Sequence, residues 1–154
     1  LIVACDTIVV HEGEILGKPA DLPDAYRMLR ALSGHKHDVI TGLALLPPDE
    51  DEPVRIHVRT NTWMRELSDA DIDEWAARGE LLGCAGAYNI EAHLAFVESD
   101  ECYQNVAGLP LCHLYALLDG GAAGEAPASL VRPVQACDAA RGVFCRMGEC
   151  MVGR

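Results

Sequence analysis

The stretch that decides the fold is Leu1-Ile2-Val3-Ala4-Cys5-Asp6-Thr7-Ile8-Val9-Val10. It is almost wholly apolar and rich in β-branched residues, and the turn signal Glu12-Gly13-Glu14 follows it. A continuous apolar run of this length predicts a strand covered on both faces, as in the sheets of α/β proteins. Burying an unpaired carboxylate is costly. Asp6 therefore either lies at a solvated or hydrogen-bonded strand end or serves a function.

A segment with a positive charge follows the predicted turn. In Gly17-Lys18-Pro19, the glycine lets the backbone approach a ligand closely and the lysine supplies a mobile cation. Because this segment is adjacent to the strand, Asp6 and Lys18 are expected to face one site. This pairing favours the functional interpretation of Asp6.

Further motifs follow in a fixed order. Each is common alone, but the series resembles the Maf family of nucleoside triphosphate pyrophosphatases over residues 1 to about 118. The motifs that carry the resemblance are Cys5-Asp6-Thr7, Gly13-Glu14-Ile15-Leu16-Gly17-Lys18-Pro19, Met28-Leu29-Arg30-Ala31-Leu32-Ser33-Gly34, Thr41-Gly42, Leu67-Ser68, Ala85-Gly86-Ala87-Tyr88-Asn89-Ile90-Glu91 and Asn105-Val106-Ala107-Gly108-Leu109-Pro110.

The resemblance implies a fold and a reaction. The fold is α/β, a mixed sheet flanked by helices in an inosine-triphosphatase-like architecture with a cleft between two lobes. The reaction is attack of water on the α-phosphorus of a nucleoside triphosphate, which releases the monophosphate and pyrophosphate. The family's Ser-x-Ser-Pro-Arg-Arg loop has no counterpart, so the domain at 1–119 is expected to be N-terminally truncated, lacking roughly the first third of a family-length domain. This chain alone is then expected to hydrolyse nucleotides poorly.

The resemblance also assigns site residues. Asp6 takes the place of the proton acceptor, and a carboxylate held in an apolar strand would be a stronger base than in water. Thr7 matches a position linked to substrate choice and Lys18 the lysine that contacts phosphate. A divalent cation, Mg²⁺ or Mn²⁺, would bridge phosphate oxygens, with Asp6 as a candidate ligand.

The preferred base stays open at this stage. Glu91 stands where the dTTP/UTP branch has glutamine and resembles the branch that takes 7-methyl-GTP, whereas Thr7 favours the first branch. From hydrogen-bonding chemistry we predict that Glu91 selects a guanine-type base and that Glu91→Gln shifts preference toward dTTP and UTP. Gly83-Cys84 also departs from the Asp-Lys that the family often has there, which removes a cation.

Composition limits the partners. The net charge is −12, which excludes an extended nucleic-acid surface. No run reaches the roughly 18 to 20 apolar residues of a membrane span. Seven cysteines without a zinc-like spacing fit reduced thiols in the cytoplasm. The expected partner is the nucleotide itself, and a homodimer is compatible with the resemblance. His35-Lys36-His37 could bind a metal, but a solvated loop after a helix is the favoured interpretation.

Local signals place the other elements. A helix is expected from the N-cap Asp21 to Gly34, strands over 39–46, 54–63 and 94–97, a helix after the capping box Ser68-Asp69-Ala70-Asp71, and a last helix from Pro110. The small residues Gly83 to Tyr88 suit either a loop close to a ligand or a tight turn. Residues 120–154 are read as a linker and a loosely ordered tail containing cysteines.

Two alternatives remain. One is an enzyme of the inosine triphosphatase type, which has a similar fold and reaction but different motifs. The other is a non-catalytic nucleotide-binding or division-regulating protein.

Overall fold

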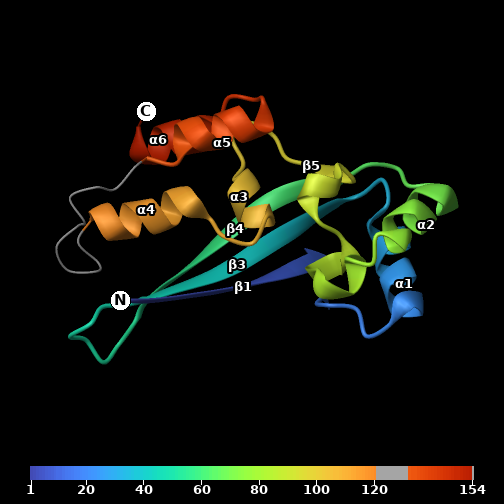
Figure 1. Ribbon diagram of the computed structural model, residues 1–154, viewed down its shortest axis with the longest axis horizontal. Helices are drawn as coiled ribbons and strands as arrows, with labels where there is room; N and C mark the ends of the chain where they lie inside the picture. Colours follow the sequence, from blue (N-terminus) through green and yellow to red (C-terminus); the bar gives the residue numbers. More distant parts are fainter. Residues whose placement is uncertain (121–131, 154) are drawn as a thin grey trace.

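A five-stranded sheet forms the centre of the computed structural model, which describes residues 1–120 and 132–153 (Figure 1). The strand order is β2-β1-β3-β4-β5. The strands are β1 (Ile2–His11), β2 (Glu14–Leu16), β3 (Lys36–Leu46), β4 (Val54–Met64) and β5 (Ala95–Phe96). Every pairing among them is antiparallel. The α/β class is confirmed, with an antiparallel sheet in place of the mixed one expected.

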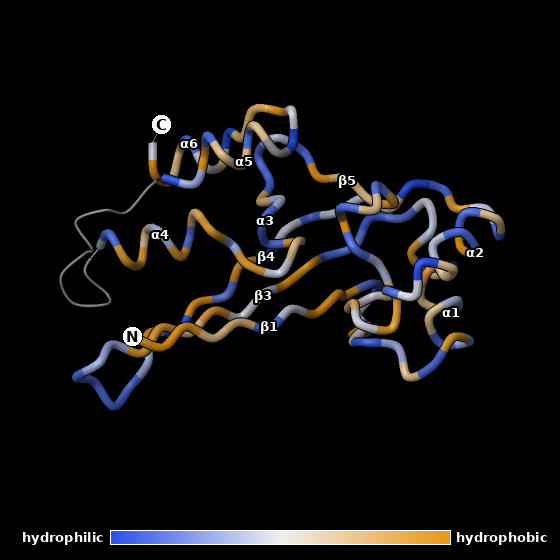
Figure 2. The backbone as a smooth tube through the Cα atoms, in the orientation of Figure 1, coloured by the Kyte–Doolittle hydropathy of each residue, from blue (hydrophilic) through white to orange (hydrophobic). Residues whose placement is uncertain are grey.

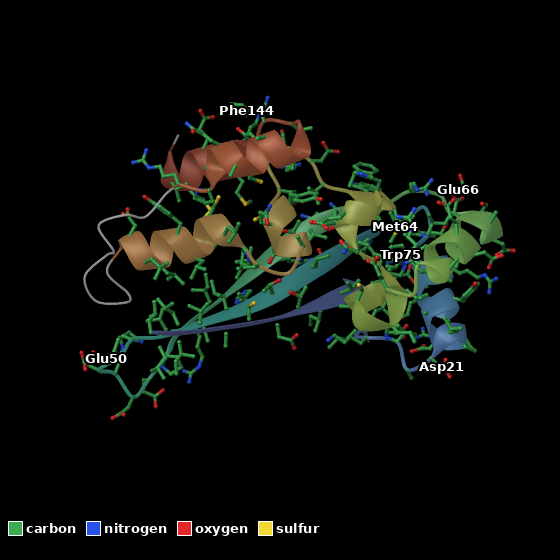
Figure 3. All side chains as sticks on the ribbon, in the orientation of Figure 1. Asp21, Glu50, Met64, Glu66, Trp75 and Phe144 are labelled. Carbon is green, nitrogen blue, oxygen red and sulfur yellow. The ribbon has the colours of Figure 1, made fainter. Side chains whose placement is uncertain are left out.

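The helices form two groups around the long strands (Figure 1). At one end lie α1 (Leu22–Leu32), α2 (Asp69–Ala77) and three 3₁₀ turns, η1 (Leu81–Gly83), η2 (Ala85–Ala87) and η3 (Ile90–Ala92). The second group lies on one side of the sheet, with α3 (Tyr103–Val106) packed on β3 and β4 and followed by α4 (Leu111–Asp119), α5 (Val134–Arg141) and α6 (Arg146–Val152). The core cluster lies between the sheet and the α1/α2 end, where Leu29 and Leu32 of α1 and Trp75 of α2 are buried (Figure 3).

The helix starts that depend on local chemistry are confirmed. Asp21 caps α1 by accepting from the backbone N–H of Asp24 at 2.9 Å. Ser68 and Asp71 form the capping box of α2, in which each side chain accepts from the other residue's backbone N–H. These caps satisfy helix donors that have no partner within the helix.

The first half of β1 corrects the expectation of a strand covered on both faces. Residues 1–6 are exposed, and only Val9 is fully buried. The face that carries Asp6 is open, since Gly42 and His57, its neighbours across β3 and β4, are also exposed. In addition, the short β2 pairs with β1 only over Val9–His11 and leaves the outer edge of residues 2–8 without a strand partner in the described residues. Figure 2 shows this apolar part of β1 running out to the N-terminus, beside the polar β3–β4 turn.

Two helices occupy 132–153, where a loosely ordered tail was expected. Val134, Cys137 and Cys145 are buried, and α6 packs on α4. The backbone of Gly148 makes this possible, because a Cβ there would lie 3.0 Å from Val134 and 3.2 Å from the Sγ of Cys112. Most of the linker predicted from Gly120 onward lies outside the described residues.

Candidate active site

A cavity of about 280 Å³ lies between the β1–β2 edge of the sheet and the loops that follow α2 and α3. It is bordered by β1, by Lys18, by the loop 83–89 and by residues 106–108. Asp6, Thr7 and Lys18, three of the four predicted site residues, border this one cavity. The loop 83–89, read from its small residues as a ligand-side loop or a tight turn, contributes Gly83, Cys84, Ala85, Tyr88 and Asn89 to its wall.

Thr7 faces the interior of the sheet. Its hydroxyl lies 2.8 Å from that of Thr41 on β3, directly opposite in the strand register. Thr41 is fully buried, and its hydroxyl lies 3.3 Å from the main-chain oxygen of Asn105, to which it donates in the hydrogen-bond pattern of the structure. A chain of hydrogen bonds, through Thr41 to the main-chain oxygen of Asn105, therefore fixes the position of the Thr7 hydroxyl.

Asp6 lies at the rim of the cavity. Successive strand residues face opposite sides of a sheet, so Asp6 faces away from Thr7 and pairs across to Gly42. It also borders a second, more open hollow of about 310 Å³ on the sheet, which Ala44 and Arg55 share. The side chain is exposed, so the predicted burial of this carboxylate in an apolar strand is wrong. Gly42 and His57, its neighbours across β3 and β4, are exposed as well, so this face of the sheet is open.

Lys18 is exposed on the connection between β2 and α1. This connection is tied to the opposite wall, since the Gly86 N–H donates to the Gly17 carbonyl at 3.0 Å. Burial, followed by the charge of Glu80, raises the pKa of the Cys84 thiol, and the nearby Lys18 opposes the rise. In a chain of net charge −12, Lys18 is the one lysine or arginine among the described residues that border the cavity.

The fourth predicted residue, Glu91, is exposed on η3 and is not among the residues that border the cavity. Asn89, two residues earlier, does border it. Asn89 caps η3, with its Oδ1 accepting from the Glu91 N–H at 2.9 Å. That bond occupies the Oδ1 of Asn89.

Sequence reasoning missed His37. The expected solvated loop at 35–37 is instead the start of β3, and His37 is 3% exposed. Its Nε2 lies 2.8 Å from the hydroxyl of Tyr88 in the cavity wall. The signal in the sequence was the alternation of the strand. His37 lies two residues before Val39 and four before Thr41, so its side chain is on the same buried face as theirs.

Asn105 belongs to one of the motifs that carry the resemblance, and its side chain also stabilises the site. The side chain is fully buried, and its Nδ2 donates to the carbonyls of Val39 and Val58 and lies near the Thr60 hydroxyl, each at 3.1 Å. Three residues later, Gly108 borders the cavity, and its carbonyl accepts from the Cys5 thiol at 3.5 Å. Asn105 thus fixes the 106–108 wall to β3 and β4.

The donor set suits a metal ion held jointly with a ligand. Within 1–120 and 132–153, no group of three or more His, Cys, Asp or Glu side chains is arranged to hold a metal. Asp6 is the one carboxylate among the described residues at the cavity. Mg²⁺ commonly binds through one or two carboxylates with phosphate oxygens and waters completing its shell. The residues therefore fit a cation shared with a phosphate ligand.

Comparison with known proteins agrees with this geometry. The model of the Maf-like protein family matches residues 1–120. The chain belongs to the Maf-like family.

Three Maf-like relatives carry the name dTTP/UTP pyrophosphatase. The protein from Clostridium kluyveri is 39% identical over 122 residues, 78% of this chain and 64% of the relative. That from Geotalea uraniireducens is 43% identical over 114 residues, 73% of this chain and 59% of the relative. That from Syntrophomonas wolfei is 43% identical over 120 residues, 77% of this chain and 64% of the relative. The chain thus spans less than two thirds of the length of these relatives.

None of the helices that the structure describes is both long and apolar enough to cross a bilayer.

Proposed function

We propose that this chain acts in a nucleoside triphosphate pyrophosphatase that releases pyrophosphate and a nucleoside monophosphate. The observation that carries the proposal is the convergence of Asp6, Thr7 and Lys18 on one cavity in a chain of the Maf-like family. A hydroxyl and an ammonium at the cavity and a carboxylate at its rim supply a hydrogen-bonding group, a phosphate-binding cation and a proton acceptor.

Each residue has a role in the proposed reaction. Lys18 contacts phosphate oxygens through its ammonium group, which concentrates positive charge where the acidic chain otherwise lacks it. Asp6, at the rim, accepts a proton from the attacking water, which adds to the α-phosphorus as the pyrophosphate leaves. Thr7, held by Thr41, presents its hydroxyl to the substrate at a fixed position.

A divalent ion, Mg²⁺ or Mn²⁺, completes the proposed site, with Asp6 as its protein ligand. Such an ion would neutralise phosphate charge and polarise the phosphoryl oxygens. The chain itself supplies the carboxylate and leaves the remaining positions to phosphate and water.

We propose that Asn89, rather than Glu91, contacts the base, and that pyrimidine triphosphates such as dTTP and UTP are substrates. The names of the relatives support this substrate class. With its Oδ1 engaged by the Glu91 N–H, the Asn89 Nδ2 can donate to a carbonyl oxygen of thymine or uracil.

We also propose a cellular location and an assembly for the protein. All seven cysteines are free thiols, which supports a reducing compartment, and the cytoplasm is the proposed location. A homodimer is the proposed assembly, and sedimentation of the purified protein tests it.

The test is pyrophosphate release from a panel of triphosphates with and without Mg²⁺. Lys18→Met is expected to raise KM by about tenfold or more, the value of one hydrogen bond from a charged donor. The chain holds one other lysine, Lys36, which lies over the Trp63 ring and away from the cavity, so Lys36→Met is the matched control. Equal KM values for the two variants would contradict the assignment of Lys18.

The same panel separates the alternative. A protein that binds triphosphates at this cavity, loses binding with Lys18→Met and releases no pyrophosphate would be a non-catalytic nucleotide-binding protein.

A further inference from the structure

The cavity wall formed by residues 84–89 is held from several sides. The indole N–H of Trp75 donates to the Ala87 carbonyl at 2.8 Å, and the Gly86 N–H donates to the Gly17 carbonyl at 3.0 Å. The Tyr88 hydroxyl lies 2.8 Å from the Nε2 of His37. These bonds join the wall to α2, to the Lys18 connection and to β3.

The wall requires such support because its backbone is strained. Gly86 has φ 65° and Ala87 has φ 62°, and a residue other than glycine rarely adopts positive φ. A backbone of this kind persists only where its surroundings hold it. The Tyr88 ring follows Ala87 immediately, so its anchor acts next to the one strained residue of this wall among those described.

The anchor is a buried pair of aromatic rings. Tyr88 is 5% exposed, and its ring meets that of His37 edge to face at 5.4 Å between centroids. Burial lowers the pKa of His37 to about 4, aided by His11 and opposed by Asp38 and the His35 backbone. Burial also raises the pKa of Tyr88. Both rings are therefore neutral near pH 7.

We infer that His37 is a positioning residue that fixes Tyr88 and, through it, the wall of residues 84–89 against which the substrate binds. His37 itself is absent from the residues that border the cavity, so it acts only through Tyr88. The effect on turnover rests on the proposed function. The effect on the wall does not, because it can be measured without substrate.

The first experiment measures amide exchange by mass spectrometry in the peptide that contains Gly86 and Ala87. His37→Phe and Tyr88→Phe each remove the hydrogen bond while keeping an aromatic ring, and each is expected to speed this exchange about tenfold, as for loss of one buried hydrogen bond. His37→Gln, whose amide can replace the Nε2 contact, should restore much of the protection. His57→Phe is the control, because His57 is exposed on β4 away from the wall.

Trp75 supplies a second readout. In a Trp63→Phe background it is the only tryptophan, and its indole is bonded to Ala87. Loosening of the wall is expected to increase quenching of its fluorescence by acrylamide in Tyr88→Phe, which removes a single oxygen and should fold. Unchanged quenching and exchange in the folded Tyr88→Phe and His37→Phe variants would overturn the inference.

Kinetics then test the consequence for the substrate. In the active enzyme, His37→Phe and Tyr88→Phe are expected to raise KM severalfold with a smaller change in kcat, because the wall positions substrate and donates no reacting group. An unchanged KM in variants whose wall is loosened would overturn the link to substrate. If the wild type released no pyrophosphate, the proposed function would fail, and the exchange and quenching results would still decide the role of His37.

Discussion

The hydroxyl oxygens of Thr7 and Thr41 lie 2.8 Å apart across β1 and β3. Thr41 also contacts the main-chain oxygen of Asn105 at 3.3 Å, so the cavity residue Thr7 is linked to the segment that forms the opposite wall. One series of buried hydrogen bonds thus connects two sides of the candidate site.

Thr41→Val tests this chain, since it removes the hydroxyl while nearly keeping the shape. We expect the free energy of unfolding to fall by about 0.5 to 1.5 kcal/mol, because the Thr7 hydroxyl loses its partner while the Asn105 oxygen still accepts from the Gly108 N–H. Urea denaturation measures the change. In a double-mutant cycle with Thr7→Val, the two losses should be less than additive. Full additivity would show that the hydroxyls do not interact.

In the active enzyme, Asp6→Asn should leave the fold intact and abolish pyrophosphate release. The side chain is exposed, so the change costs little stability, while the amide cannot accept the proton from water. Circular dichroism and a pyrophosphate assay check the two halves of this prediction. Asp49→Asn in the exposed β3–β4 turn is the matched control. Near-normal turnover by folded Asp6→Asn would remove Asp6 from the reaction.

Base selection should follow Asn89. Asn89→Asp replaces the Nδ2 donor with a second acceptor, which disfavours thymine and uracil carbonyls. We expect the ratio of kcat/KM for dTTP to that for dGTP to fall by about tenfold or more, the range for an unpaired buried group. Glu91→Gln, outside the cavity lining, should change this ratio little. A larger shift with Glu91→Gln than with Asn89→Asp would restore Glu91 as the selecting residue.

The buried His37 also gives stability a pH dependence. Its pKa falls from the ordinary 6.5 to about 4 in the folded protein, so between these values the unfolded chain binds more protons. Stability is therefore unaffected by this group above pH 6.5 and declines as the pH falls toward 4, by on the order of 3 kcal/mol in total.

Unfolding free energies of wild type and His37→Gln at several pH values check this sign. The difference between the two proteins cancels the carboxylates that also titrate in this range. We expect the advantage of wild type over His37→Gln to shrink as the pH falls from 6.5 to 4. A difference that does not vary with pH would mean that His37 is not held neutral.

Features that depend on neighbours in sequence could be predicted, and features that depend on distant strands could not. Asp21 and Ser68 cap helices through bonds within three residues, so their patterns suffice. The exposure of Asp6 depends instead on which face of the assembled sheet is left open, which no pattern within the strand reveals.

The residues of the candidate site fall into the same two groups, those predictable from sequence neighbours and those that depend on distant strands. Lys18 lies close to Asp6 in sequence, and its place at the same cavity was predicted. Tyr88 and His37 are 51 positions apart, and their contact arises only when the wall folds against β3. Asn105 likewise carries no periodic signal, because its partners belong to β3 and β4.

The close approach of Gly86 to β1 has a consequence for the evolution of the family. A Cβ at Gly86 would lie 3.0 Å from the Cγ2 of Val9, closer than an ordinary contact between carbon atoms. A homologue that acquires alanine at this position would need a smaller residue in place of Val9, and its backbone would still have to tolerate positive φ. These two positions, 77 apart in the chain, should therefore vary together rather than independently across the family's history.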